Sequence, residues 1–422
     1  MKKKVISAAL AGTLAVSLLS ACGASNEPQN ISDVSSAASS EATSTTASSE
    51  STGDAAQELT FVLSNIPDGL DPSVTNNSFA QYVLINCFEG LVTYDSTGTL
   101  VPGNAESWDI SDDGLTYTFH LRDGLKWSDG SDLTAEDYVY TIQRVLTPAT
   151  AAQYVSMATD YIKNAQEYYD GTATADDLGV KALDDKTLEI TLIQPTSYFI
   201  DILSMWTFSP VQKATVEANG DKWSTEADTY ICNGPFKIAS MSMNENVILE
   251  KNENYWDADS INMDEMDFKF NVTGDTGVDM MLADELDFVP NGSAMQQQTL
   301  TDAGFESSKY TTSYHCLNIN HAGKTEETGL FLGNANFRKA VSYAIDRTAL
   351  CASVMTGAEP ANRLTAPSEA GVTGTFDEEF EYEGWPASAD VEKAQEYLNA
   401  ALDELGKTAD EIPTFELLCY ES

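Results

Sequence analysis

Residues 101–145 read VPGNAESWDISDDGLTYTFHLRDGLKWSDGSDLTAEDYVYTIQRV, and they contain both kinds of periodicity that decide the fold. Between residues 117 and 121, apolar side chains alternate with polar ones, which is the period of a half-buried β-strand. Residues 134–137, TAED, resemble a capping box with Asp in place of Glu or Gln, so they predict the start of a helix. One face of that helix collects Tyr138, Ile142 and Val145.

The rest of the folded part shows the same two patterns on either side of this stretch. Strands are predicted at residues 59–64, 188–192, 235–239 and 247–251. Helices are predicted at residues 79–94, which run into a short strand after Gly90, at 337–355 and at 391–405. The helix at 337–355 would place on one face Val341, Ala344, Ile345 and Thr348. Mixed helices and strands without an internal repeat indicate a multi-domain chain of α/β and α+β type.

The chain is strongly acidic. Its 422 residues include 22 Lys and Arg against 66 Asp and Glu, a net charge of −44. Such a surface repels phosphate backbones, so we expect no nucleic-acid partner. The hydrophobic content of 42% is ordinary for a globular protein, and the length suffices for two or three domains.

The N-terminus has the features of an export signal. Three lysines at residues 2–4 precede an apolar run, residues 5–19, that is too short to span a membrane comfortably. Residues 19–22 read LSAC, which matches the processing box of bacterial lipoproteins. The alternative is a simple signal peptide with an incidental cysteine. We expect a signal peptide at residues 1–21 and a membrane-anchoring lipid on Cys22.

Residues 22–57 are predicted to form a disordered tether between the lipid and the folded part. Ser, Thr, Ala, Glu and Asp dominate this segment and it has no aromatic residue, so it cannot bury enough apolar area to offset the entropy of ordering. The cysteines beyond Cys22 form no CxxC pair. Isolated thiols such as Cys87 are expected to be small buried side chains, and any disulfide pairing stays open.

Several motifs make the folded part recognisable. They read VPGNAESW at 101–108, YTFHLR at 117–122, KWSDG at 126–130, LTAEDYVY at 133–140, DLGVKALDD at 177–185, NGPFK at 233–237, NENYW at 252–256 and FRKAVSYAIDR at 337–347. In this order they resemble the peptide-binding cluster of ABC solute-binding proteins, and the motif at 177–185 resembles the oligopeptide-binding subgroup.

The resemblance implies an α/β, two-lobed fold like that of periplasmic binding proteins, of type II, with an extra α+β domain. A cleft between the lobes would enclose the ligand. Residues 58–88 and 213–271 would form lobe I, residues 89–212 the extra domain packed on it, and residues 272–422 an incomplete lobe II.

Members of this family continue well past Ser422, so the resemblance implies that the last part of lobe II is missing. In the family that part returns the chain to lobe I and contains an aspartate that pairs with the α-ammonium of the peptide. We therefore expect the 422-residue chain to bind peptides weakly or not at all, and an extended version to bind them tightly, because an unpaired buried charge is costly.

The resemblance also implies a set of ligand-binding residues. In lobe I they are Thr75, Asn76, Asn77 and Ser78. Their main chain would pair with an extended peptide, and the alternative is a polar loop that ends in a helix cap. In the extra domain and lobe II they are Tyr154, Asp275, Tyr314 and Asn318. An exposed helix aromatic is the alternative for Tyr154, and the match at Asp275 could shift onto Gly274.

Three other patterns point to no chemistry. The sequence GKT at 323–325 ends like a phosphate-binding loop, but Asn318 stands where that loop needs glycine. Residues 109–114, DISDDG, begin like a calcium loop, but the twelfth position is His120. With three histidines and no HExxH or GxSxG motif, we predict no metal, no cofactor and no enzymatic activity.

The implied function is that of an extracytoplasmic, lipid-anchored solute-binding subunit of an ABC importer. It would act as a monomer, enclose an oligopeptide by closure of its lobes and deliver it to the permease and its ATPase subunits. One rival is the same scaffold with another ligand: a dipeptide, a signalling peptide, a nickel chelate, haem or an oligosaccharide. The other rival is a lipid-anchored secreted hydrolase.

Overall fold

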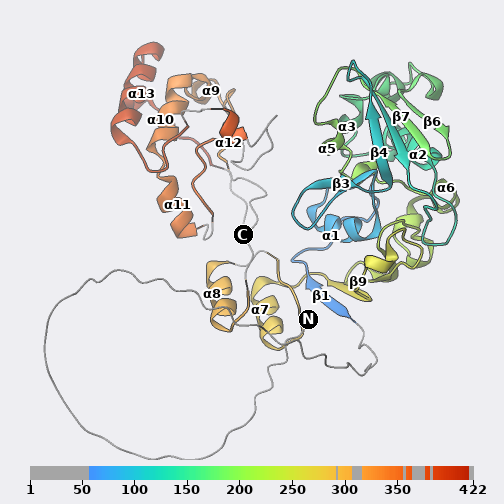
Figure 1. Ribbon diagram of the computed structural model, residues 1–422. Coiled ribbons are helices and arrows are strands. Elements are labelled where there is room, and N and C mark those ends of the chain that lie inside the picture. The colour runs from blue at the N-terminus through green and yellow to red at the C-terminus, as the bar shows by residue number, and fades with distance from the viewer. Residues whose placement is uncertain are drawn as a thin grey trace, which may run out of the picture. The chain divides into compact units, whose positions relative to one another are not determined.

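The computed structural model describes residues 57–290, 293–306, 316–354, 358–363, 376–380 and 384–417 (Figure 1). The predicted signal peptide at 1–21 and the tether, up to residue 56, lie outside these residues. So do Cys22 and Tyr314. Among the residues that the structure describes, none of the helices has the length and apolar character needed to cross a bilayer.

One four-stranded sheet combines a strand from the start of the folded part with three strands from about 180 to 200 residues later. Its strands are β1 (Glu58–Val62), β8 (Phe236–Ser242), β9 (Asn246–Lys251) and β10 (Glu265–Lys269). The order is β1-β10-β9-β8, with β1 parallel to β10 and the other pairs antiparallel. The aromatic rings of Phe61 and Phe268, which face each other in the parallel pair, stack at 4.9 Å. The predicted strands at 59–64, 235–239 and 247–251 are confirmed.

Helix α1 (Ser78–Cys87) packs against β8 of this sheet. Its start is set by Asn77, whose side-chain oxygen accepts hydrogen bonds from the backbone N–H of Phe79 and Ala80, at 2.8 and 3.1 Å. A short polar side chain in this position replaces partners that the first turn of a helix lacks. The helix cap given as the alternative for residues 75–78 is therefore present, at Asn77.

The second four-stranded sheet is built from strands that lie close in sequence. They are β4 (Ala105–Ile110), β5 (Thr116–Leu121), β6 (Val180–Asp184) and β7 (Thr187–Thr191), in the order β4-β5-β7-β6 and all antiparallel. The predicted alternation is confirmed, because β5 buries Tyr117, Phe119 and Leu121. Helix α2 (Ala135–Val145) packs on β6 and β7 (Figure 1).

Helix α2 begins as the sequence predicts. The Asp137 carboxylate accepts a hydrogen bond from the backbone N–H of Thr134 at 2.9 Å, which is the reciprocal half of a capping box. Further elements of residues 89–219 are short. They are the hairpin strands β2 (Val92–Tyr94) and β3 (Leu100–Pro102) and the helices α3 (Ser156–Thr159), α4 (Ala165–Tyr169), α5 (Phe199–Ile202) and α6 (Lys213–Asn219).

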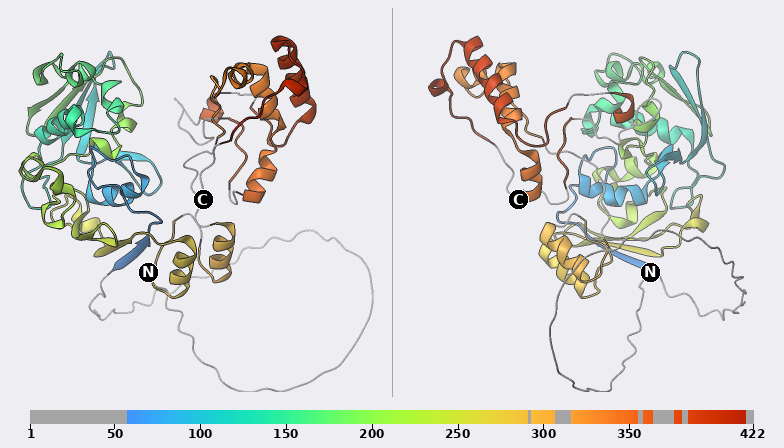
Figure 2. Two further views of the ribbon diagram at one scale, coloured as in Figure 1. Left: turned by 180° about the vertical axis from the view of Figure 1, so that it is seen from behind. Right: turned by 60° about the vertical axis from the view of Figure 1, so that its left-hand side comes forward.

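After β10 the described elements are helical (Figure 2). Helices α7 (Gly274–Leu282) and α8 (Ala294–Asp302) contact each other, and a small core next to them combines Val62, Met281 and Leu286. The later helices are α9 (Glu326–Gly333), α10 (Ala335–Ala344), α11 (Arg347–Val354), α12 (Phe376–Glu379) and α13 (Val391–Leu405). Helices α9, α10 and α13 share a core of Phe331, Phe337, Ala401 and Leu402. The predicted helix at 391–405 is confirmed, and Gly406 ends it at φ 63°.

The single helix predicted at 337–355 is wrong. The structure has two helices there, because Ile345 is extended (φ −85°, ψ 121°) and a new helix starts at Arg347. The Asp346 carboxylate accepts a hydrogen bond from the backbone N–H of Ala349 at 2.8 Å, so Asp346 caps α11. Asp competes for backbone donors in this way and favours helix starts over helix interiors. Residue 355 lies outside the described part.

The cysteines fit the expectation of small buried side chains only in part. Cys87 and Cys232 are free thiols that are fully buried, whereas Cys316 is exposed and Cys351 is half-buried. Burial raises the pKa of the Cys87 thiol well above its usual value, and the neighbouring Cys232 raises it further.

Glu89 joins three distant segments of the chain. Its carboxylate accepts hydrogen bonds from the Tyr255 hydroxyl at 2.7 Å and from the Trp256 indole at 2.6 Å, and its carbonyl oxygen accepts one from Asn104 at 2.7 Å. The Arg122 guanidinium lies 3.7 Å above the centre of the Trp256 ring. Glu89 is only 7% exposed, and this burial raises the pKa of its carboxyl despite the hydrogen bonds.

Glu89 should make the stability of the protein depend on pH. Because its pKa in the folded state lies above the ordinary value of 4.5, the folded state binds this proton more tightly than the unfolded state does. Stability from this group is therefore present below the ordinary value and is lost as pH rises through the raised pKa. We expect the wild type to lose more stability than Glu89→Gln between about pH 4 and about pH 7 in urea unfolding. Parallel pH profiles for the two proteins would contradict this assignment.

Candidate functional site

A largely buried ion pair fixes the segment that follows β1. The Asp71 carboxylate accepts two hydrogen bonds from the Arg144 guanidinium of α2, at 2.9 and 2.5 Å, and each side chain is only 14% exposed. The Trp223 indole donates to the same carboxylate at 3.1 Å. A bidentate ion pair of this kind fixes both the orientation of the two side chains and the distance between them. Two elements far away in sequence therefore set the position of Asp71.

Asp71 in turn shapes a tight loop. Its carbonyl oxygen accepts hydrogen bonds from the backbone N–H of Val74 and of Thr75, both at 3.1 Å, and its Oδ1 accepts one from Ser73 at 3.0 Å. Aspartate side chains commonly stabilise turns by bonding to the backbone two residues ahead. The loop holds Thr75 and Asn76 at a fixed place between β1 and α1.

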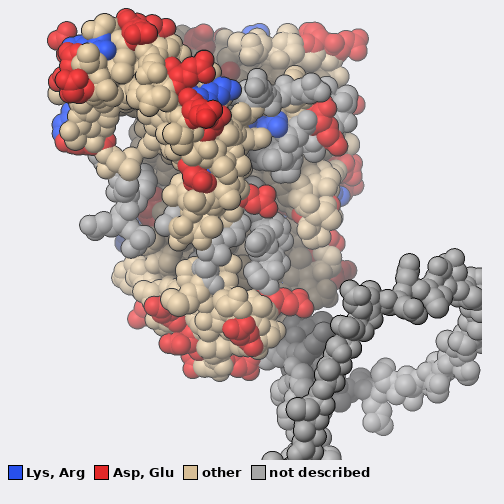
Figure 3. All heavy atoms as spheres, turned by 90° about the vertical axis from the view of Figure 1, so that its left-hand side faces the viewer, with Lys and Arg blue, Asp and Glu red and all other residues tan. Residues whose placement is uncertain are grey.

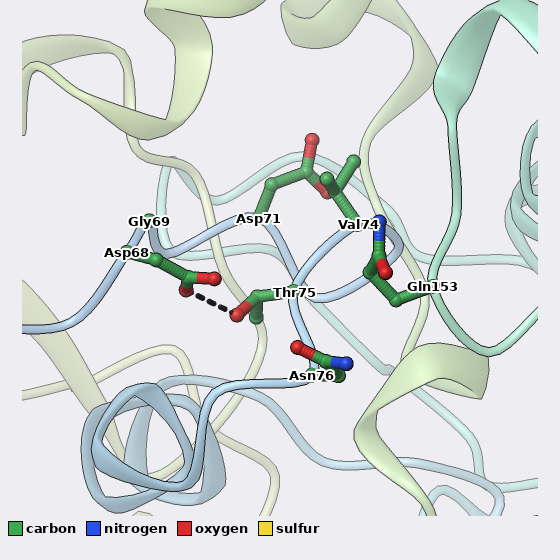
Figure 4. Close-up of a pocket in the computed structure, with 7 residues that line it drawn as sticks. All are labelled: Asp68, Gly69, Asp71, Val74, Thr75, Asn76 and Gln153. Carbon is green, nitrogen blue, oxygen red and sulfur yellow. Dashed lines mark hydrogen bonds between the residues drawn. The ribbon is translucent and has the colours of Figure 1, made fainter. Parts of the chain in front are cut away.

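A pocket of about 330 Å³ lies beside this loop (Figure 4). Its lining residues are Asp68, Gly69, Asp71, Val74, Thr75, Asn76 and Gln153. The Thr75 hydroxyl donates to the Asp68 carboxylate at 2.5 Å and accepts from the backbone N–H of Asn77 at 3.0 Å. Asn76 is exposed, and in the described residues neither its backbone N–H nor its carbonyl has a hydrogen-bond partner.

The loop is also tied to residues from two other segments of the chain. The backbone N–H of Gln153 donates to the carbonyl of Val74 at 3.2 Å, and the Trp206 indole donates to the carbonyl of Thr75 at 3.0 Å. The ring of Tyr154 meets the ring of Trp206 edge to face, with the centroids 5.7 Å apart. The aromatic pair therefore braces the loop on which the pocket is built.

Three of the residues expected from the sequence come together here. Thr75 and Asn76 line the pocket, and Tyr154 contacts Trp206, which is bonded to Thr75. Asn77 and Ser78 lead into α1 instead, with Asn77 as the cap, so the alternative reading of a polar loop and helix cap also applies to them. Whether any of these residues touches a ligand stays a prediction.

The remaining expected residues have other surroundings. Asp275 lies in the first turn of α7 and accepts a hydrogen bond from the Gln296 side chain of α8 at 2.8 Å. Asn318 precedes α9, and its side-chain oxygen lies 3.6 Å from the Cys316 sulfur. Neither residue lines the pocket at 68–76. Tyr314 lies outside the described residues.

Sequence reasoning missed Asp68, Gln153 and Trp206. Trp206 stands 131 residues from the carbonyl to which it donates, and nothing in its local sequence indicates that contact. Trp206 can be recognised as a partner of the loop only once the fold brings the two segments together.

The lining offers hydrogen-bonding groups. It contains carboxylates, amides and a hydroxyl, and no histidine, cysteine or lysine. Over the described part of the chain, no three or more His, Cys, Asp or Glu side chains are grouped so that they could hold a metal ion. The pocket is thus suited to bind a ligand through polar contacts.

The surface around the fold has the expected acidic character. On the face shown in Figure 3, acidic side chains are spread widely and basic ones are few, in keeping with the net charge of −44. Such a field disfavours polyanions.

The sequence matches one family of known proteins. The family model described as bacterial extracellular solute-binding proteins, family 5 middle, matches residues 99–421. The oligopeptide-binding protein OppA of Bacillus subtilis is 34% identical over 358 residues, which cover 83% of this chain and 63% of that protein. The chain thus spans a little under two thirds of the length of this relative.

Solved structures show the same likeness. The periplasmic oligopeptide-binding protein OppAIV of Borrelia burgdorferi, of an oligopeptide ABC transporter, is 35% identical with a TM-score of 0.67, covering 82% of this chain and 66% of that one. OppA of Haemophilus influenzae, in a complex with the peptide RPPGFSPFR, is 28% identical with a TM-score of 0.69, covering 85% and 68%.

Proposed function

Because the chain belongs to family 5 of the bacterial extracellular solute-binding proteins and so has their two-lobed α/β fold, we propose that it captures oligopeptides for an ABC importer. The pocket at residues 68–76 is the part of the described chain that we assign to the ligand. Delivery to a permease with its own ATPase subunits, and action as a monomer, belong to the same proposal.

The observation that carries this proposal is the state of Asn76. Its backbone N–H and carbonyl point to no partner in the described residues, although the loop around them is held by bonds from Asp71, Gln153 and Trp206. An extended peptide can satisfy such groups by pairing like an added strand, without its side chains being read closely. A fixed loop with free backbone groups is therefore a suitable start for peptide recognition.

Calorimetric titration with a mixed library of short peptides tests the proposal. We expect saturable binding by the wild type and binding roughly three- to tenfold weaker by Trp206→Phe, which loses the hydrogen bond to the carbonyl of Thr75. Tyr94→Phe is the matched control, because it removes a polar group from an aromatic side chain that is 51% exposed. Binding of a chelate, haem or oligosaccharide in place of peptides would overturn the proposal.

Catalysis is not part of the proposed function. The family binds solutes, and the pocket lining contains no histidine, cysteine or lysine. Peptides incubated with the protein should be recovered intact by mass spectrometry. Turnover that disappears after one point mutation would favour the rival of a secreted hydrolase.

The lipid anchor is a separate proposal that rests on the sequence LSAC at residues 19–22. We expect Cys22→Ala to move the protein from the membrane fraction to the soluble extracytoplasmic fraction, because the acyl chains supply the anchoring energy. Ser20→Thr, which leaves the cysteine in place, is the control. A mutant that stays with the membranes as the wild type does would show that the anchor assignment is wrong.

The other expected residues also remain proposals. Tyr154 would face the ligand beside Trp206, while Ser78, Asp275, Tyr314 and Asn318 would contribute from their own segments. We also propose the boundaries given above for lobe I, the extra domain and lobe II.

A further inference from the structure

Two segments that are far apart in the sequence run side by side at the end of α1. The backbone N–H of Gly234 donates to the carbonyl of Cys87 at 2.7 Å. The Asn233 side chain accepts from the backbone N–H of Glu89, 144 residues earlier, at 3.3 Å and donates to its carbonyl at 2.9 Å. Each segment contains one cysteine at this contact, Cys87 in the first and Cys232 in the second. Two cysteines can be bridged only where their main chains come this close.

The two thiols are enclosed in the same core. Cys87 and Cys232 are each 0% exposed and belong to one hydrophobic cluster. The Cys232 thiol donates to the carbonyl of Phe236 at 3.4 Å, which fixes its side chain. Burial raises the pKa of Cys87, and the adjoining Cys232 raises it further through a hydrogen bond and through charge repulsion. The backbone contact therefore brings the two thiols together as well.

We infer that Cys87 and Cys232 form a disulfide in the exported protein and so join the end of α1 to the segment that leads into β8. The family to which the chain belongs is extracellular, and thiols outside the cytosol are not kept reduced. A bond between segments so far apart in sequence restricts the unfolded chain strongly, which stabilises the folded state. The inference depends on the extracytoplasmic location of the family and is independent of the ligand.

The oxidant that the step needs is the disulfide of an exported thiol oxidoreductase. The thiolate of one cysteine attacks that disulfide, which gives a mixed disulfide and releases one thiol of the oxidant. The thiolate of the second cysteine then attacks the sulfur of the first and releases the other thiol. Cys87 and Cys232 lose two protons and two electrons in total, and the oxidant gains them. Because both thiols are fully buried in the folded protein, the exchange takes place before folding is complete.

Cysteine mapping of the exported, full-length protein tests the inference. Protein collected from the extracytoplasmic side is unfolded in guanidinium with a maleimide and without reductant, then digested and analysed by mass spectrometry. We expect one cross-linked pair of peptides that contains Cys87 and Cys232, lighter by two hydrogen atoms than the two separate peptides. A sample that is reduced before the maleimide is added should instead show both cysteines alkylated. Alkylation of both without reduction, or a link from either one to another cysteine, overturns the inference.

Thermal unfolding measures what the bond contributes. Wild-type protein that has been reduced in guanidinium and refolded with reductant should melt about 5–10 °C below the oxidised protein. The double variant Cys87→Ala with Cys232→Ala should melt at the same temperature with and without this treatment. Cys351→Ala is the matched control, because Cys351 lies in α11, and it should keep the sensitivity of the wild type to reduction.

A difference of wild-type size that persists in the double variant would assign the effect of reduction to another pair of cysteines and overturn the inference. The mapping uses the wild type alone, so it decides the matter even where the double variant does not fold. Either result leaves peptide capture untouched, because Cys87 and Cys232 do not line the pocket at 68–76.

Discussion

Asp71→Ala is expected to lower the free energy of unfolding by about 3–5 kcal/mol, because it leaves a buried guanidinium without its counter-charge. The Arg144 side chain is 14% exposed and donates two of its hydrogen bonds to this carboxylate. The Trp223 indole would lose its acceptor at the same time. An unpaired buried charge costs more than the pair contributes, so removal of one partner is the harmful change.

Urea unfolding followed by tryptophan fluorescence measures this effect. Asp112→Ala, at an exposed turn, is the control and should change the free energy of unfolding by less than about 0.5 kcal/mol. The double variant Asp71→Leu with Arg144→Met should recover much of the loss, since it removes both charges and keeps apolar volume. A single Asp71→Ala variant as stable as the wild type would show that the pair is not buried in solution.

Gly234→Ala is expected to destabilise the protein by about 1–3 kcal/mol, through overlap with main chain that cannot rotate away. A Cβ at this position would lie 2.6 Å from the carbonyl carbon of Cys87 and 2.7 Å from the nitrogen of Phe88. The backbone N–H of Gly234 donates to the Cys87 carbonyl at 2.7 Å, and that bond would have to lengthen. The end of α1 would then separate from the chain that leads into β8.

Gly69→Ala is the matched control, because a Cβ at Gly69 would meet nothing within 4 Å. It should leave the midpoint of urea unfolding unchanged or raise it slightly, since alanine restricts the unfolded chain more than glycine does. Equal stability of Gly234→Ala and the wild type would mean that the two segments lie further apart than the structure indicates.

Local patterns in the sequence predicted the local elements well. The alternation at 117–121 and the capping box at 134–137 each depend on interactions within a few residues. The prediction of a single helix at 337–355 was wrong for an equally local reason. The apolar periodicity continues through Asp346, but the Asp346 side chain caps a new helix.

The site could be predicted only in part, because its contacts are long-range. The resemblance indicated Thr75, Asn76 and Tyr154, and the structure brings them to one place. The contacts of Thr75 with Trp206 and of Asp71 with Arg144 cross 131 and 73 residues. Neither the periodicity nor the spacing of residues in the sequence predicts these long-range contacts. Only the resemblance to a known family indicated the site residues.

The parallel pairing of β1 with β10 sets an order on the folding of this chain. The N–H of Gln57 at the edge of this pair bonds to the side chain of Asp264, 207 residues further on. Because closing so long a loop is slow, sheets with neighbouring strands form sooner. During synthesis the sheet of β4 to β7 can assemble before β10 has been made and β1 can pair with it. A nascent chain that stops after residue 251 would already possess β8 and β9, yet its first strand would have no neighbour and would present an unpaired edge.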